Sequence, residues 1–425
     1  MVVGTIIGAS IFVQPSVVTG NVPSIVGIFA VWGVAGLLTL CGSLIAAELA
    51  SAFPRTGGVY VFLKEAYSPA LGFLWGWAMF WTMHTGIIAA IAMVFARYVA
   101  YFVPMGDVAQ RAAAIGAILL LSAINYFGVR QGSAVQTTFT IGKVLAITIV
   151  IAIGYAFGPR FPLPDTLAGA VSARGFLLAV GAGLFAFGGW HMVTYAAGET
   201  VDPRRTIPRA LAIGTIVVTA CYMLLNGAYL HVLPLRTVIT SARVAADAAD
   251  AVLGAGGAAV MSALVTFSSF GAVSGIVLAG PRAYLSMAED GLLFRWVREV
   301  HPTFRTPHRA IVLQAVWAAV LIATGSYRVL VARVIYTEWI FFALMALGVV
   351  LLRRRSTYVP SYRVPLFPAL PLAFAAVAIV VVANQIAEQP LESAAGLLLV
   401  LAGWPVYHLW VRRPTAPSRV LDHGD

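Results

Sequence analysis

Long apolar stretches alternate with short polar ones along the whole chain. Each stretch has about 20 residues and few charges, which is the length an α-helix needs to cross the hydrocarbon core of a bilayer. Twelve membrane helices are predicted, at residues 1–20, 24–50, 70–103, 111–129, 134–157, 176–198, 207–230, 258–287, 308–325, 334–352, 366–386 and 391–411. The pattern therefore predicts an all-α polytopic membrane protein, with a single transmembrane domain over 1–411 and a cytoplasmic tail over 412–425.

Two of these stretches are interrupted by small residues. The first contains Gly8-Ala9-Ser10, and the second contains Gly188-Gly189, with Gly188 following Gly8 by 180 positions. An unwound backbone at membrane depth is stable only where it lines a cavity or meets a ligand. The alternative is that these glycines merely allow close helix packing. Two interruptions at matching places in two halves favour an inverted-repeat secondary transporter with its site between the interruptions.

Composition supports the membrane assignment and narrows the partners. Hydrophobic residues make up 60% of the chain and charged residues only 10%, whereas an average soluble domain is about 25% charged. The net charge of +11 is spread over short loops, but a nucleic-acid binder needs a basic face. The lipid bilayer is thus an expected partner, and nucleic acid is not.

The basic residues also predict an orientation. Of the 27 lysines and arginines, 18 fall in loops on the side of the N-terminus, 8 fall on the opposite side, and Lys143 lies within a helix. The positive-inside rule then puts both termini in the cytoplasm of a cell-membrane protein.

No cleavable signal peptide is expected at the start of the chain, because no basic region precedes the first apolar stretch and no small-residue cleavage site follows it. Seven residues precede Gly8 and span roughly 10 Å as a helix, whereas the bilayer midplane is about 15 Å from its edge. We therefore expect the cytoplasmic half of the first helix to be short.

Several sequence strings follow one another in the order of a known family. They are Gly4–Phe12, Glu48–Tyr60, Asn125–Arg130, Phe185–Trp190, Asp202–Pro203 with Pro208–Ala210, and Pro281–Arg282 with Glu289–Gly291. In these strings the chain resembles the transporters of the amino acid, polyamine and organocation (APC) superfamily, and among them the L-type amino acid exchangers and their bacterial relatives.

The resemblance implies a LeuT-like five-plus-five inverted repeat with helices 1 and 6 broken. Repeat one would cover about 1–157 and repeat two about 176–352, with peripheral helices over 366–411. It also implies an α-amino acid substrate, a gating role for the aromatic Phe185, and a role for Lys143 in place of the sodium of sodium-coupled relatives. Lys143 would brace helix 1 against helices 5 and 8, so no sodium requirement is expected.

A zwitterion fits the chemistry of two interrupted helices. Free N–H groups at the start of a half-helix attract an anion, and exposed carbonyls at the end of another accept hydrogen bonds from an ammonium. On this reading the N–H groups of Gly8, Ala9 and Ser10 hold the carboxylate, and the carbonyls of Ile6, Phe185, Ala186 and Gly188 hold the amino group. The predicted substrate-binding residues are Ile6, Gly8, Ala9, Ser10, Phe185, Ala186, Phe187 and Gly188.

The residues of the two interruptions indicate that the substrates are neutral amino acids, because neither interruption contains an acidic residue that would select a cationic side chain. Candidate pocket residues are Met83, Gly86, Ile87, His191 and Ser274. A basic amino acid or polyamine antiporter is the alternative. Serine at position 10, where most members of the superfamily carry glycine, narrows the approach and can add a hydroxyl contact.

The other polar residues in the apolar stretches have simpler interpretations. Lys143 could instead snorkel to the headgroups, and His84 and His191 could line the cavity, although hydrogen-bonded packing is the preferred interpretation. Glu48 and Glu199 are expected to pair with loop arginines. Cys41 and Cys221 lie in separate apolar stretches, so no disulfide, metal site or cofactor is expected.

The sequence offers no constellation of nucleophile and base for an enzyme and no filter motif for a channel. A secondary transporter is therefore predicted, and exchange and proton-coupled uptake both stay open. The loop between helices 3 and 4 lacks the cysteine that links some L-type relatives to an accessory subunit. An accessory subunit is therefore not expected.

Overall fold

The computed structural model describes residues 1–158, 171–254, 256–325 and 327–411. Within these ranges the structure contains helices and no strands. Nine helical segments there are long and apolar enough to cross a membrane. They are Ile25–Ala52, Pro69–Val99, Asp107–Tyr126, Gln136–Phe157, Ala173–Glu199, Pro203–Val232, Gly257–Glu289, Ala369–Glu388 and Pro390–Leu409. Two shorter apolar helices, His308–Thr324 and Tyr336–Leu352, accompany them. The predicted all-α polytopic membrane architecture is confirmed.

The elements follow the apolar stretches closely. In the first half they are α1 (Val2–Ile6), η1 (Ser10–Phe12), α2 (Gln14–Asn21), α3 (Ile25–Ala52), α4 (Val59–Ala66), α5 (Pro69–Ala78), η2 (Met79–Met83), α6 (His84–Val99), α7 (Asp107–Tyr126) and α8 (Val129–Phe157). In the second half they are α9 (Ala173–Ala186), η3 (Trp190–Glu199), α10 (Pro203–Val232), α11 (Leu235–Thr240), α12 (Val244–Leu253), α13 (Gly257–Glu289), η4 (Arg295–Arg298), α14 (His308–Thr324), α15 (Tyr327–Leu352), α16 (Ala369–Glu388), α17 (Pro390–Leu401) and α18 (Gly403–Val411). The predicted tail 412–425 lies outside the described residues.

Serine residues begin several of the long helices. Ser24, Ser68 and Ser172 precede α3, α5 and α9, and each side chain accepts a hydrogen bond from the backbone N–H three residues later. Such N-caps satisfy a donor that has no partner within the helix. Local sequence therefore sets where these helices start.

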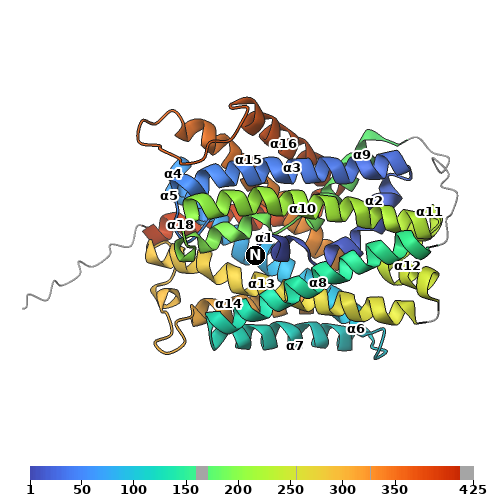
Figure 1. Ribbon diagram of the computed structural model, residues 1–425. Coiled ribbons are helices and arrows are strands. Elements are labelled where there is room, and N and C mark those ends of the chain that lie inside the picture. Colours follow the sequence, from blue (N-terminus) through green and yellow to red (C-terminus); the bar gives the residue numbers. More distant parts are fainter. Residues whose placement is uncertain (159–170, 255, 326, 412–425) are drawn as a thin grey trace, which may run out of the picture.

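The long helices run side by side as a bundle, with α3, α10, α8, α13 and α7 crossing the view of Figure 1 in the same general direction. α10 packs along α3, α13 packs against both α6 and α8, and α15 packs on α16. Small residues allow the closest approaches: a Cβ on Gly36 of α3 would lie 2.7 Å from the hydroxyl oxygen of Thr219 on α10. In hydrocarbon such close packing supplies much of the association energy.

Ion pairs gather at the end of the bundle where α4 and α5 lie, on the left in Figure 1. Glu48 at the end of α3 accepts two hydrogen bonds from Arg353, at 2.9 and 2.6 Å, and this carboxylate raises the pKa of the Arg353 guanidinium. Glu199 accepts two from Arg282, at 2.7 and 2.8 Å. The two carboxylates thus have the arginine partners expected from the sequence, although Arg282 belongs to α13 and not to a loop.

Candidate functional site

The backbone leaves the helical conformation in the middle of the first apolar stretch. α1 ends at Ile6, Ile7 is extended with φ −69° and ψ 96°, and α2 starts only at Gln14 after the short turn η1. The three small residues sit at this point. The residues predicted to form one span at 1–20 are therefore arranged as α1, η1 and α2.

A similar change occurs between α9 and η3. α9 ends at Ala186, and Gly189 has a left-handed φ of +95°. A Cβ on Gly189 would lie 2.7 Å from the carbonyl oxygen of Thr5. Only glycine combines this conformation with so close an approach. Gly189 therefore brings the two non-helical segments together.

Lys143 of α8 reaches the end of α1. It is 1% exposed, and its Nζ donates to the carbonyl oxygens of Gly4 at 2.6 Å and Ile7 at 2.5 Å. The last carbonyls of a helix have no partner within that helix and attract a cation. The side chain thus points inward onto the first interruption and does not extend toward a headgroup region.

Tyr222 of α10 connects the two interruptions, and no feature of the sequence pattern distinguishes it from other tyrosines in apolar stretches. Its fully buried hydroxyl lies 3.1 Å from the carbonyl oxygen of Ile6 and 3.0 Å from that of Ala186. The rings of Phe187 and Trp32 pack on Tyr222, with centroids at 4.9 and 5.8 Å. A hydroxyl has one proton to donate, so each carbonyl keeps the capacity to accept a second hydrogen bond.

A cavity lies between the two interruptions, with about 10 Å³ open to the centre of a water molecule. Its lining residues are Thr5, Ile6, Gly8, Ser10, Ile87, Ile91, Phe185, Gly188, Gly189, Met192 and Ile276. That volume suffices for about one water. The structure therefore shows this site in a closed conformation.

The cavity brings together about half of the residues named from the sequence. Ile6, Gly8, Ser10, Phe185, Gly188 and Ile87 line it, whereas Ala9, Ala186, Phe187, Met83, Gly86, His191 and Ser274 do not. Thr5, Ile91, Gly189, Met192 and Ile276 line it without having been selected. Ile91 follows Ile87 by one helical turn, so the period of α6 was the available signal.

The two histidines lie behind the cavity wall. His191 is 1% exposed, and its ring packs against Trp75, Tyr195 and Phe342, with centroids at 5.9, 5.5 and 5.0 Å. The Nε2 of His84 lies 2.9 Å from the carbonyl oxygen of Ile276. Since a carbonyl only accepts, this nitrogen carries the proton. Both rings are packing residues in this conformation.

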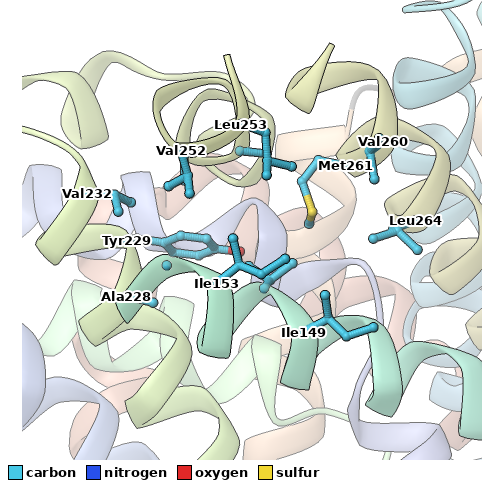
Figure 2. Close-up of a pocket in the computed structure, with 14 residues that line it drawn as sticks. Ile149, Ile153, Ala228, Tyr229, Val232, Val252, Leu253, Val260, Met261 and Leu264 are labelled. Carbon is cyan, nitrogen blue, oxygen red and sulfur yellow. The ribbon is translucent and has the colours of Figure 1, made fainter. Parts of the chain in front are cut away.

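A second, larger cavity lies away from these interruptions, among α8, α10, α12 and α13 (Figure 2). Its volume is about 70 Å³, and its lining is almost entirely hydrocarbon. The ring of Tyr229 forms one wall, opposite Leu253 and Met261 (Figure 2). No charged side chain that could pair with a zwitterion occurs among its described lining residues.

The sequence of the chain is similar to those of known proteins along nearly its whole length. The family described as amino acid permease matches residues 1–404. The serine/threonine exchanger SteT of Bacillus subtilis (strain 168) is 33% identical over 413 residues, which cover 96% of this chain and 94% of that protein. The human b(0,+)-type amino acid transporter 1 is 30% identical over 421 residues, covering 97% and 86%.

The rabbit (Oryctolagus cuniculus) large neutral amino acids transporter small subunit 2 is 30% identical over 439 residues, covering 97% of this chain and 80% of that protein. The resemblance drawn from the sequence strings is thereby confirmed. Because the matches extend over nearly the whole chain, this protein belongs to the amino acid permease family and is a membrane transporter of amino acids.

Proposed function

We propose that the chain transports neutral L-amino acids across the cell membrane by alternating access, without sodium. The observation that carries this proposal is the cavity between the two interruptions, where backbone groups of both segments converge beside apolar side chains. Zwitterion recognition by backbone and an apolar wall for the side chain together define a neutral amino acid site.

The α-carboxylate is assigned to the N–H groups of Gly8, Ala9 and Ser10, at the start of η1. The amino group is assigned to carbonyls at the ends of α1 and α9. Those of Ile6 and Ala186 already face the hydroxyl of Tyr222, so we infer that the ammonium binds beside that hydroxyl or displaces it.

The wall residues support a neutral side chain. Ile87, Ile91, Met192 and Ile276 line the cavity, and no carboxylate occurs among its described lining residues. A cationic substrate would need such a group. The names of the relatives also favour neutral substrates, since one is a serine/threonine exchanger and another a large neutral amino acids transporter. A basic amino acid or polyamine antiporter is the second candidate.

The closed cavity requires a moving part, and we assign Phe185 as the gate. Its side chain is 6% exposed and lines the cavity at the end of α9. A cavity that holds about one water molecule is too small for an amino acid. Displacement of this aromatic ring is the change that admits substrate.

Lys143 supports the sodium-independent assignment. Its ammonium lies on the carbonyls of Gly4 and Ile7, and a fixed cation there leaves no electrostatic reason to bind a second one. We assign it the coupling role of bracing α1 against α8.

For the whole chain we propose twelve membrane helices in two repeats, about 1–157 and 176–352, with peripheral helices over 366–411 and both termini cytoplasmic. The interrupted segments α1–η1–α2 and α9–η3 would be helices 1 and 6 of this scheme. We propose that the chain acts without an accessory subunit. A membrane-embedded enzyme and a channel are the remote alternatives, and the relatives are named as transporters and an exchanger.

The test is counterflow in proteoliposomes loaded with unlabelled amino acid, with a panel of labelled substrates outside. Neutral amino acids, small hydroxylated ones included, should enter saturably and compete with one another. Uptake should be the same in sodium and choline buffers. Counterflow of arginine but not of serine or leucine would overturn the neutral assignment, and a flux that does not saturate would indicate a channel.

A further inference from the structure

Glu338 is a buried carboxylic acid inside α15. It is 5% exposed and lies among apolar neighbours such as Trp339 and Phe342 of the same helix. Among the residues whose side chains the structure describes, its carboxyl makes no hydrogen bond and no ion pair. An isolated carboxylate in such a place costs several kcal/mol, so it must take up a proton or gain a partner.

The side of α15 that carries this acid packs on η3, because the ring of Phe342, one helical turn after Glu338, lies 5.0 Å from the His191 ring. Tyr195 of η3 is fully buried and lies near Glu338 and near Tyr284 of α13. The His191 ring lies 5.5 Å from the Tyr195 ring. The Nδ1 of His191 and the hydroxyl of Tyr284 have no hydrogen-bond partner in the described part of the chain. We call Glu338, Tyr195, Tyr284 and His191 the acid cluster.

The other elements packed on α15 are α3, α4, α6, α9, α16, α17 and η2, and none of their described side chains forms an ion pair with Glu338. Their ionised groups pair elsewhere: Glu48 with Arg353, Lys64 with Asp290, Glu65 with Arg55, and Glu388 with Arg174. The remaining titratable groups on these elements are Cys41, Tyr60, His84, Arg97, Tyr98 and Glu392. The acid cluster therefore contains a carboxyl without a described cationic partner.

The acid cluster and the substrate cavity share one structural segment. η3 follows directly on Gly188 and Gly189, and its residue Met192 lines the cavity next to His191. Phe342, on the same side of α15 as Glu338, packs on Trp190 and His191 of this short helix. A shift of α15 on protonation of the acid would therefore reach the cavity wall through η3.

We propose that Glu338 is a proton-binding site that couples proton movement to amino acid transport. This inference rests on the proposed function. The carboxylate takes a proton from water on one side, forming an O–H bond, and crosses the closed conformation neutral. When the site opens to the other side, the O–H bond breaks, the proton passes to water there, and water stabilises the carboxylate that remains. One positive charge then moves with each zwitterion.

The experiment compares two driving forces in the same proteoliposomes. With an acidic exterior and a neutral interior, the wild type should accumulate labelled neutral amino acid above its outside concentration. A pH-sensitive dye in the lumen should report acidification that depends on added amino acid. Glu338→Gln mimics the protonated acid, so it should keep counterflow exchange, because the loaded protein still moves between its two states. Its accumulation of labelled amino acid under the pH gradient should be lower than that of the wild type by about tenfold or more.

Glu388→Gln is the matched control, since Glu388 lies on α16 and pairs with Arg174 outside the cluster; it should accumulate substrate like the wild type. Glu338→Asp keeps a carboxyl and should shift the pH profile of accumulation, which keeps the test decisive if Glu338→Gln does not fold. Gradient-driven accumulation by Glu338→Gln, or none by a wild type that shows counterflow, would overturn the proton site. Absence of counterflow in the wild type would instead overturn the proposed function.

Discussion

At the first interruption the carbonyls of Gly4 and Ile7 face the ammonium of Lys143. At the second, backbone groups satisfy one another: Gly188 donates to Phe185 at 3.0 Å and Met192 donates to Gly189 at 3.1 Å. The first segment also has turns of its own, since Phe12 donates to Ala9 at 3.1 Å and Val13 donates to Ser10 at 3.0 Å. It depends in addition on a buried charge supplied by another helix. Two interruptions that look alike in sequence differ in what keeps them folded.

The largest effect is expected from removing that charge. Lys143→Ala should leave the carbonyls of Gly4 and Ile7 without their donor and lower the counterflow rate by about tenfold or more, which corresponds to about 1.4 kcal/mol or more. Hydrogen exchange followed by mass spectrometry should rise in peptides covering 1–13 and stay unchanged over 185–199.

Lys64→Ala is the control for this variant, because Lys64 is the only other lysine and pairs with Asp290 on α13's C-terminal side. It should retain most of its activity. Wild-type counterflow by Lys143→Ala, at equal protein in the liposomes, would contradict the bracing role.

The next effect should come from the second interruption. Gly189→Ala places a Cβ 2.7 Å from the Thr5 carbonyl oxygen in a left-handed backbone. Strain of this kind costs roughly 1–3 kcal/mol, and we expect a severalfold to tenfold loss of counterflow. Gly116→Ala on α7 is the matched control, since no atom lies within 4 Å of its added Cβ. Equal rates for the two variants would show that the segments need not approach so closely.

A smaller effect is expected at the proposed gate. Phe185→Ala should lower the maximal rate by several-fold while changing substrate affinity less, because a gate contributes mainly to the closing step. Concentration dependence of counterflow separates the two parameters. If affinity collapsed at an unchanged maximal rate, Phe185 would be a pocket wall.

The smallest effect should come from the group common to both interruptions. Tyr222→Phe removes one hydroxyl and keeps the ring against Phe187 and Trp32. Loss of a neutral hydrogen bond can cost as little as about 0.5 kcal/mol, so a roughly twofold lower counterflow rate is expected. Tyr155→Phe is the control, because that hydroxyl lies 3.4 Å from the Leu224 carbonyl oxygen at an exposed position. Equal rates for the two variants would exclude a role in transport for the hydrogen bonds of the Tyr222 hydroxyl.

The apolar pattern was sufficient to place the helices, since a run of hydrocarbon side chains has few alternatives to a membrane helix. It also located both interruptions, because Gly8 and Gly188 mark backbone that does not continue a helix. Pairing of Glu48 and Glu199 with arginines followed from the cost of unpaired charge.

Contacts between distant segments could not be predicted in this way. Tyr222 and Ile6 are 216 positions apart, and a tyrosine in an apolar stretch can equally face lipid or another helix. The roles of Gly189 and Glu338 depend on the segments that pack against them, which the sequence pattern does not identify. Ala9, Phe187 and His191 were selected from the right segments, but the direction of each side chain depends on turns that the sequence pattern does not show.

The cavity among α8, α10, α12 and α13 bears on the thermal stability of the protein (Figure 2). The cavity is open on one side, since Ile149, Leu253 and Val260 of its wall are 53%, 51% and 54% exposed. Ala228 lies on its wall and is 2% exposed, so a larger aliphatic side chain there would fill space that is now unpacked. The cavity lies apart from both interruptions and from Lys143. It therefore marks a position where the melting temperature in detergent can be raised while the transport machinery stays unaltered.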